Sequence, residues 1–421
     1  MSEAVAPKGL RRTFLALSVP NFRIYFIGQL ISVSGTWLQS FALGLLVLKL
    51  TGSLATAGTV VGIQFIPMLV AGSWAGLVVD RSRKRPILYS TQMAALTLAL
   101  LLGLLTVTEH VAISWVYLIS LGTGIVNLFD NPARQTFVSE MVGPELLSNA
   151  VSLNTVIMNL ARIAGPAIGA VAVSTIGLGG CFLLNAGSYG AVMVALLVMD
   201  AKALKPTTPV TPAKGQVRDG LRYAWRKPRL RGPLLAMFVV GLLAFNFTVT
   251  VLALGKITFH GGPTLVAIFM IAQGVGAVAG GMHAAHHGKP SQHRLAVLGI
   301  GFGASMVMMA LMPTPLLAGA AIVVVGYTSI NYVATANGTL QLHSEPQMRG
   351  RVMALYAIAF LGTAPLGMPL IGQIADHTNP RVAILTGALA ALFSSVALLR
   401  HDDRVTSVEE GAIDPGLAGN R

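Results

Sequence analysis

Apolar residues occur along this chain in runs of about 20 residues, separated by short polar or basic stretches. An α-helix of about 20 residues crosses the roughly 30 Å of hydrocarbon in a bilayer. The pattern therefore predicts twelve membrane-spanning helices, six on each side of a polar break over residues 200–231. The runs begin near Ile24, Leu54, Ile87, Ala112, Asn149, Cys181, Gly232, Thr264, Leu295, Leu316, Val352 and Val382.

Composition supports this prediction. Of the 421 residues, 54% are hydrophobic and only 10% are charged, and the mean hydropathy is +0.71. A protein whose surface faces water carries far more charge than this. The fold class that we predict is an all-α membrane protein with twelve transmembrane helices in two pseudo-symmetric six-helix bundles.

The net charge of +14 suggests nucleic acid as a partner until the positions of the bases are considered. If the N-terminus is cytoplasmic, Lys49, Lys256 and Arg381 fall outside the cell, Arg162 falls within a span, and every other Lys and Arg falls in a cytoplasmic segment. This asymmetry is the positive-inside rule. The asymmetry argues against nucleic acid as a partner, and it predicts that both termini are cytoplasmic.

The break and the ends of the runs define five predicted segments. These are a cytoplasmic N-terminal segment (1–22), an N-terminal six-helix bundle (23–199), a basic cytoplasmic linker (200–231), a C-terminal six-helix bundle (232–400) and a disordered cytoplasmic tail (401–421). The linker starts rich in Pro and Thr and continues as a basic, weakly amphipathic stretch over 217–225. We expect a helix there, lying on the inner leaflet in contact with anionic lipids.

The two halves resemble each other. Residues 144–153 align with residues 346–355, and Pro166 and Gly169 fall on Pro369 and Gly372 after a one-residue adjustment. This predicts a 6+6 repeat.

The hairpin between the second and third runs, residues 71–86, joins an apolar helix to an acid and a group of bases. Its spacing of Gly, Asp and bases resembles the signature of the major facilitator superfamily between spans 2 and 3, although Arg83 and Pro86 stand where the family usually has Gly and a further base. The resemblance implies alternating access around a central cavity and a cytoplasmic gate at which Asp80 faces residues 349–352 and a base at the end of span 4. The implied gate residues are Gly76, Asp80, Arg81, Lys84, Arg85, Asp130, Arg134 and Arg351.

Span 4 and the span that follows resemble the enterobactin-exporter and macrolide-efflux branch of the superfamily. The resemblance rests on residues 122–137, on Asn154, Asn159 and Arg162, and on the motif of residues 165–169. In that motif Pro166 removes a backbone donor and is expected to kink the helix, while Gly165 and Gly169 admit a close neighbour. The branch implies a drug:proton antiporter or a siderophore exporter.

The chain carries no P-loop, nucleophile elbow or zinc-protease pair, so we expect neither an enzyme nor ATP-driven transport. We expect no cofactor or metal, because the histidines 283, 286, 287 and 293 lie in a loop where solvated positive charge suffices. Cys181, inside an apolar run, is expected to be a packing residue.

Arg162 is the one ionisable group that the pattern places near the middle of a span. Two roles stay open: binding an anionic group of a substrate, or bonding to neighbouring carbonyls and fixing span 5. The polar residues within spans either line a cavity or join helices. The candidates for substrate binding or coupling are Arg162, Gln29, Gln39, Asn127, Asn154, Asn159, Asn246 and Asn331.

The sequence thus predicts a monomeric exporter of small molecules in a bacterial inner membrane, coupled to protons. A nutrient-uptake symporter of the same fold is the first alternative, and a membrane sensor or scaffold that transports nothing is the second. Neither the substrate nor the proton carrier is specified by the sequence.

Overall fold

The computed structural model describes residues 14–205, 216–286 and 290–413. In these ranges every regular element is a helix, and the helices fall into two compact units. Unit 1 comprises Met1–Leu50 and Ile66–Pro212, and unit 2 comprises Thr51–Phe65 and Ala213–Arg421. The all-helical membrane fold predicted from the sequence is confirmed.

The elements of unit 1 follow the predicted runs. They are η1 (Leu15–Ser18), α2 (Pro20–Thr51), α4 (Ile66–Asp80), α5 (Lys84–Val107), α6 (Ile113–Val142), α7 (Leu147–Val198) and η2 (Ala201–Ala203).

Helix α7 is 52 residues long, which at 1.5 Å per residue is roughly 78 Å and more than twice the thickness of the bilayer core. It is interrupted at Gly177, where φ is +73° and the backbone is not helical. A glycine adopts this conformation without the strain that a Cβ atom would cause. Eleven helical stretches of the described residues are long and apolar enough to span a membrane, and dividing α7 at Gly177 yields the predicted twelve.

The interior of unit 1 is formed where α2, α6 and α7 meet. Phe22 and Tyr25 of α2 and Phe137 of α6 are almost completely buried, and the rings of Tyr25 and Phe137 meet edge to face with centroids 5.6 Å apart. Because these helices are apolar on most of their faces, their interior positions are marked by large aromatic and small residues and not by a polar stripe on the opposite face.

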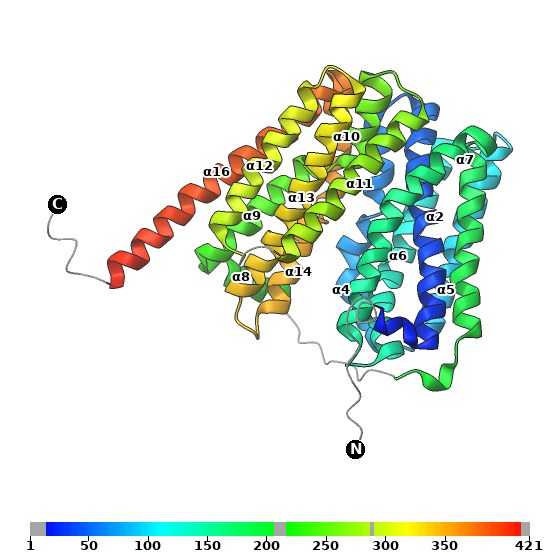
Figure 1. Cartoon of the computed structure of the whole chain (residues 1–421), viewed down its shortest axis with the longest axis horizontal. Helices are drawn as coiled ribbons and strands as arrows, with labels where there is room; N and C mark the ends of the chain where they lie inside the picture. Colours follow the sequence, from blue (N-terminus) through cyan, green and yellow to red (C-terminus); the bar gives the residue numbers. More distant parts are fainter. Residues whose placement is uncertain (1–13, 206–215, 287–289, 414–421) are drawn as a thin grey trace. The chain divides into compact units, whose positions relative to one another are not determined.

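Unit 2 contains the remaining helices. They are α3 (Leu54–Ile63), α8 (Gln216–Arg226), α9 (Pro228–Leu243), α10 (Phe247–Ala253), the π-helix η3 (Leu254–Thr258), α11 (Pro263–His286), α12 (Gln292–Leu311), α13 (Pro315–His343), α14 (Arg349–Phe360), α15 (Ala364–His377) and α16 (Pro380–Ile413). In this unit α9, α12 and α16 lie side by side (Figure 1). The core includes an aromatic group in which Phe245 contacts Phe247, Phe302 and Phe360.

Helix α3 lies in the predicted N-terminal bundle but groups with unit 2, because it packs along α15. A Cβ atom on Gly58 would clash with the backbone of Met368, and one on Gly372 would clash with the backbone of Leu54. The carboxylate of Asp376 caps the start of α3, accepting hydrogen bonds from Ser53 Oγ at 2.7 Å and from the backbone N–H groups of residues 54 and 55 at 2.8 and 2.9 Å.

Two further segments differ from or extend the predictions. The helix predicted within the linker is confirmed as α8. The last helix, α16, continues to Ile413, through the first part of the segment predicted to be a disordered tail, since no proline interrupts it before Pro415.

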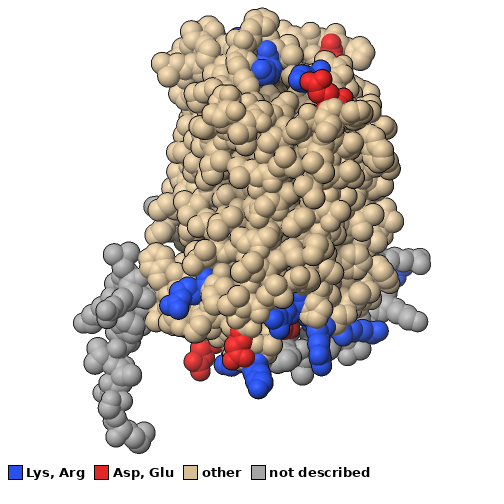
Figure 2. All heavy atoms as spheres, turned by 90° about the vertical axis from the view of Figure 1, so that its right-hand side faces the viewer, with Lys and Arg blue, Asp and Glu red and all other residues tan. Residues whose placement is uncertain are grey.

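Charged side chains are confined to the ends of the helices on the face that Figure 2 displays. Among the described residues visible there, the middle of the face carries no Lys, Arg, Asp or Glu, and most of the Lys and Arg gather at one end. An apolar belt of this kind is what the bilayer requires of a surface that faces lipid.

Candidate functional site

A buried ionic cluster lies in the interior of unit 1. Asp130 and Arg134 are one turn apart on α6, with side chains that are only 4% and 13% exposed, and Arg134 Nε donates to Asp130 Oδ2 at 3.0 Å. Asp130 Oδ1 also accepts hydrogen bonds from Thr91 Oγ1 at 2.8 Å and Gln92 Nε2 at 2.9 Å, both on α5. Arg134 Nη1 donates to Gln29 Oε1 of α2. The cluster therefore joins three helices.

Burial explains why the cluster has so many partners. An isolated charge in an apolar interior loses its hydration, so a buried acid and base are stable only when paired and further hydrogen-bonded. Asp130 has three donors and Arg134 has two acceptors, yet Gln29 Nε2 has no hydrogen-bond partner among the described groups. Within the described residues, the cluster thus keeps an amide donor without an acceptor.

The hairpin between α4 and α5 is organised by its bases. Lys84 is 5% exposed, and its Nζ donates to the carbonyls of Asp80 and Ser82 at 3.1 and 3.0 Å and lies 3.9 Å from a carboxylate oxygen of Glu140. Arg85 Nε donates to the carbonyl of Leu196 at 2.7 Å, near the C-terminal end of α7. A base is favourable there because the last carbonyls of a helix carry partial negative charge.

The other predicted gate residues have separate environments. Arg81 is exposed, Asp80 is half-buried, and a Cβ atom on Gly76 would meet no atom within 4 Å. Within the described part of the chain, no hydrogen bond or ion pair joins the side chains of Asp80 and Arg134. Arg351, in unit 2, lies 3.6 Å from Asp219 of α8.

Arg162 lies on α7 against an aromatic ring of α2. Its guanidinium carbon is 5.2 Å from the centre of the Trp37 ring, and its Nε is buried without a hydrogen-bond partner among the described residues. In the described residues this Nε bonds neither to the neighbouring carbonyls expected from the sequence nor to any Asn or Gln side chain. A cation over an indole face is stabilised by the ring quadrupole, but an N–H group without an acceptor stays unsatisfied.

The spacing of Gly165, Pro166 and Gly169 brings α7 close to α2. A Cβ atom on Gly165 would lie 2.9 Å from Ser34 O, and one on Gly169 would lie 2.6 Å from a ring carbon of Phe41. Gly165 lies opposite Trp37, so the close approach of these helices also places Arg162 beside its ring.

A second polar group joins α2 to the later part of α7. Asn185 Nδ2 donates to Gln39 Oε1 at 2.7 Å and to Tyr189 Oη at 3.4 Å. Gln39 is one of the predicted candidates, whereas Asn185 and Tyr189 are new. Their sequence signal is the spacing of four residues, which places both side chains on one face of α7.

In unit 2, Asn246 and Asn331 are 1% and 0% exposed. Each donates from Nδ2 to the carbonyl four residues earlier in its own chain segment, and the Oδ1 atom of each has no partner among the described groups. Buried acceptors without donors are uncommon and are candidates for binding a water or a ligand group. Three other candidates are less enclosed: Asn127 is exposed, Asn154 is half-buried, and Asn159 donates to Thr155 O on its own helix.

The structure offers no candidate metal centre, since no three described His, Cys, Asp or Glu side chains are grouped so as to hold an ion. His286 Nδ1 lies 2.8 Å from Met282 O, and His287 lies outside the described residues. Cys181 is buried, as expected of a packing residue, with its thiol 3.3 Å from Gly177 O.

The linker helix α8 is held to the loop between α13 and α14. Lys227 Nζ lies 2.6 Å from Glu345 Oε1 and 2.9 Å from Tyr223 Oη, and Tyr223 Oη accepts a hydrogen bond from the backbone N–H of Glu345. The hydrogen bond from Lys227 lowers the pKa of the Glu345 carboxyl, and the same bond raises the pKa of Lys227. With the Asp219–Arg351 pair, these contacts form what we call the linker clamp.

Comparison with known proteins identifies the class. The profile of a family described as "transmembrane secretion effector", of the major facilitator type, matches residues 12–417. The chain is 26% identical over 377 residues to the multidrug efflux pump Tap of Mycolicibacterium fortuitum, covering 86% of this chain and 91% of Tap. It is 24% identical over 184 residues to the staphyloferrin A transporter of Staphylococcus aureus, covering 44% of this chain and 46% of that protein.

The fold likewise has solved counterparts. A crystal structure of a bacterial homologue of the human lysosomal transporter Spinster, in an inward-facing and unoccupied conformation, superposes with a TM-score of 0.67 at 14% identity, covering 91% of this chain and 95% of that one. At this identity the likeness concerns the fold alone.

Proposed function

The chain belongs to the transmembrane secretion effector family of the major facilitator superfamily and is a multi-pass membrane transporter of small molecules, and from this premise we propose that it exports drugs or siderophores by alternating access, driven by protons. The direction is supported by the likeness to a protein named as an efflux pump and by the Gly165–Pro166 pair that resembles the efflux motif. A nutrient-uptake symporter is the alternative of the same fold.

Arg162 is the basis of the substrate proposal. Its Nε is buried and unpartnered among the described residues, while Trp37 supplies a flat apolar surface beside it. An aromatic ring and a free N–H donor together suit a cargo that combines a planar apolar part with acceptor oxygens. Drugs and catecholate siderophores both have this chemistry.

Asp130 is the carboxylate that we propose for proton coupling. It is buried on α6, and its pairing with Arg134 changes if Asp130 takes up a proton. Loss of that charge would weaken the hydrogen bond to Arg134 and shift Arg134 toward the amide oxygen of Gln29, so protonation is linked to the packing of α2 against α6.

The orientation and the gate also belong to the proposal. We place both termini and the Lys- and Arg-rich helix ends in the cytoplasm of a bacterial cell, with the linker on the anionic inner leaflet and the transporter a monomer. Asp80 would bias the cytoplasmic gate toward its closed state. The gate is tested with Asp80→Asn, which should slow export while insertion is retained; a wild-type rate would argue against it.

The deciding experiment is transport into proteoliposomes with and without an imposed pH gradient, using a panel of dyes, macrolides and catechol siderophores. Proton-coupled export requires that uptake of at least one compound into inside-out vesicles depends on the gradient and stops when an ionophore collapses it. Uptake that follows the substrate gradient alone would contradict proton coupling.

A further inference from the structure

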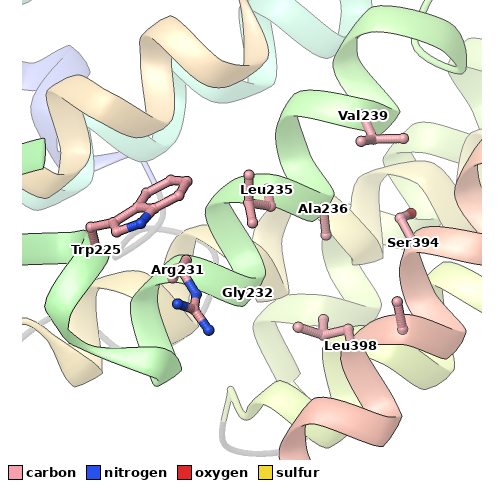
Figure 3. Close-up of a pocket in the computed structure, with 9 residues that line it drawn as sticks. Trp225, Arg231, Gly232, Leu235, Ala236, Val239, Ser394 and Leu398 are labelled. Atoms are coloured by element: carbon pink, nitrogen blue, oxygen red, sulfur yellow. The ribbon is translucent and has the colours of Figure 1, made fainter.

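Unit 2 contains an apolar groove where α8, α9 and α16 meet. Its volume is about 450 Å³, and it is lined by Trp225 from α8, by Arg231, Gly232, Leu235, Ala236 and Val239 from α9, and by Ser394, Ala397 and Leu398 from α16. Figure 3 shows Leu235, Ala236 and Val239 along one wall, with Ser394 and Leu398 facing them from the other. Almost all of the lining is carbon.

The groove lies on a surface that faces lipid and not in the protein core. Leu235 and Phe238 of α9 and Phe393 of α16 are 45%, 44% and 70% exposed. Both helices are apolar enough to span the membrane, and large exposed apolar side chains on such helices contact acyl chains. A cavity between them is therefore open to the lipid phase.

One end of the groove carries hydrogen-bond donors. Arg231 is the fourth residue of α9 and is half-buried, and its guanidinium has no hydrogen bond or ion pair within the described residues. Trp225 lies on α8, immediately before that end of α9, and its ring and the guanidinium of Arg231 lie on the same side of the groove (Figure 3). Trp is typical of the boundary between headgroups and hydrocarbon.

Among the residues whose side chains the structure describes, no acid competes for Arg231 in the groove. None of the nine lining residues is acidic. Two acids of the same unit, Asp219 and Glu345, are engaged in the linker clamp with Arg351 and Lys227. An arginine beside an apolar channel, with no acidic partner among the described side chains, is complementary to a phosphate ester that carries an acyl chain, because guanidinium binds phosphate through two parallel hydrogen bonds.

We propose that this groove is a binding site for one anionic phospholipid of the leaflet at that end of the helices, with an acyl chain between α9 and α16 and the phosphate on Arg231. The proposed function places the basic linker on a surface of anionic lipids. The present proposal goes further and assigns one lipid molecule to one defined site. Since α8 is fixed to the α13–α14 loop by the linker clamp, the bound lipid fills the joint between α8, α9 and α16 and stabilises unit 2.

The test uses the full-length protein reconstituted in nanodiscs of phosphatidylcholine with or without phosphatidylglycerol, and native mass spectrometry after extraction. Arg231→Gln removes the charge, and Ala397→Phe fills the groove and leaves the charge in place. Arg226→Gln, an exposed arginine of α8 outside the lining, is the matched control. We expect the wild type and Arg226→Gln to retain one phosphatidylglycerol and to gain thermal stability from it.

Arg231→Gln should bind phosphatidylglycerol about tenfold more weakly, as loss of one charged hydrogen-bonded contact implies. Ala397→Phe should also weaken binding, because its ring occupies the space of the acyl chain. Inorganic phosphate alone should not stabilise the wild type, because the acyl chain supplies part of the binding. The site would be overturned if all four proteins retained phosphatidylglycerol equally, or if Arg226→Gln lost as much of this lipid as Arg231→Gln. It would also be overturned if the wild type retained phosphatidylcholine as well as phosphatidylglycerol. Dye transport by the same four proteins in sealed proteoliposomes tests the proposed function separately, because a protein that binds the lipid but transports no dye supports the lipid site and fails only the transport proposal.

Discussion

Among the described residues of unit 1, Arg134 and Arg162 place guanidinium groups in the interior, and the two are compensated in different ways. Arg134 has a carboxylate and an amide oxygen as acceptors, whereas Arg162 has an aromatic face and, among the described residues, an unpartnered Nε. A fully bonded cation fixes the helices around it, while a buried N–H donor without an acceptor costs free energy that a bound acceptor group would recover. The two arginines should therefore respond differently to substitution.

For the ion pair, we expect Asp130→Asn to destabilise the protein by about 3 kcal/mol, because it leaves Arg134 buried without a countercharge. Adding Arg134→Gln to the same protein should recover part of that loss, since no unpaired charge then remains. Thermal unfolding in detergent measures both, with Glu145→Gln as a control at an exposed acid. A double variant that is less stable than Asp130→Asn would contradict the pairing as the source of the effect.

For Arg162, the informative change is Arg162→Lys, which keeps the charge and loses the planar group that lies over Trp37. We expect transport of anionic substrates to fall more than transport of neutral ones, with the melting temperature nearly unchanged. Arg23→Lys, at an exposed position of α2, is the control. Equal loss for all substrates together with a lower melting temperature would assign Arg162 to structure.

The sequence locates these residues better than it describes their contacts. Hydropathy identifies a span because about 20 apolar residues in succession are typical of a helix that crosses a bilayer. Hydropathy does not show which side of a helix faces inward when all sides are apolar. It therefore does not predict that Gln29 contacts Arg134 or that Trp37 contacts Arg162. The pairing of Asp130 with Arg134 is different, since a spacing of four residues on one helix already favours contact between an acid and a base.

At the scale of elements, two contacts between helices are held by distinct means. Helix α8 is attached by ion pairs on an exposed surface, while α3 is attached to α15 by close backbone packing at glycines and by the Asp376 cap. The sequence predicts the helix in the linker, because a basic, weakly amphipathic stretch is typical of such a helix. It does not predict that α3 groups with unit 2, since the partner of a glycine face is not encoded locally.

The linker clamp should depend on pH. Because the folded-state pKa of Glu345 is lowered, its contribution is present above the pKa of an unpaired glutamate, about 4.3, and is lost as the pH falls through the lower folded value. Because the pKa of Lys227 is raised, its contribution is present below the pKa of an unpaired lysine, about 10.4, and is lost as the pH rises past the higher folded value.

Hydrogen exchange of the α8 amides, corrected for its intrinsic pH dependence, should thus show protection that is constant near neutral pH and falls in acid. Glu345→Gln should remove the acid transition, whereas Glu109→Gln should leave it in place. High salt should weaken protection at any pH, because the pair is exposed. A protection profile that is identical in wild type and Glu345→Gln would refute the clamp.

Because α3 packs closely against α15, replacing a glycine at that contact should cost more stability than replacing a glycine elsewhere. Gly58→Ala places a methyl group against the Met368 carbonyl and should cost about 1–3 kcal/mol. Gly190→Ala on α7 meets no atom within 4 Å and should be neutral or slightly stabilising. Melting temperatures of the two variants provide the comparison, and equal values would show that α3 is free to shift away from α15.

At the scale of the whole molecule, the internal repeat predicted from the sequence is also seen in where the corresponding helices α7 and α14 begin. Helix α7 begins at Leu147 and α14 at Arg349, each three residues after the aligned prolines 144 and 346. The first-turn hydrogen bonds correspond as well, from Ala150 N to Leu146 O and from Val352 N to Met348 O, at 2.9 and 3.0 Å. The aligned sequences therefore adopt the same local structure in the two units, as a duplicated bundle requires.

The orientation of this duplicated bundle is the property on which the gate, the linker and the lipid site all depend, and we infer it from the positions of the bases. If the Lys- and Arg-rich ends are cytoplasmic, single cysteines introduced for Ser82, Thr211 and Ser291 should resist a membrane-impermeant maleimide applied outside intact cells, while Glu109→Cys and His377→Cys should react. Thr211 lies outside the described residues and tests the linker by sequence position alone.

The native Cys181 is buried, and replacing it with Ser provides a background without its own signal. Permeabilised cells supply the control, since every site should then react. Efficient labelling of Thr211→Cys from outside would reverse the assigned orientation. The lipid site would then lie in the outer leaflet, and Asp80 would act on the outer side.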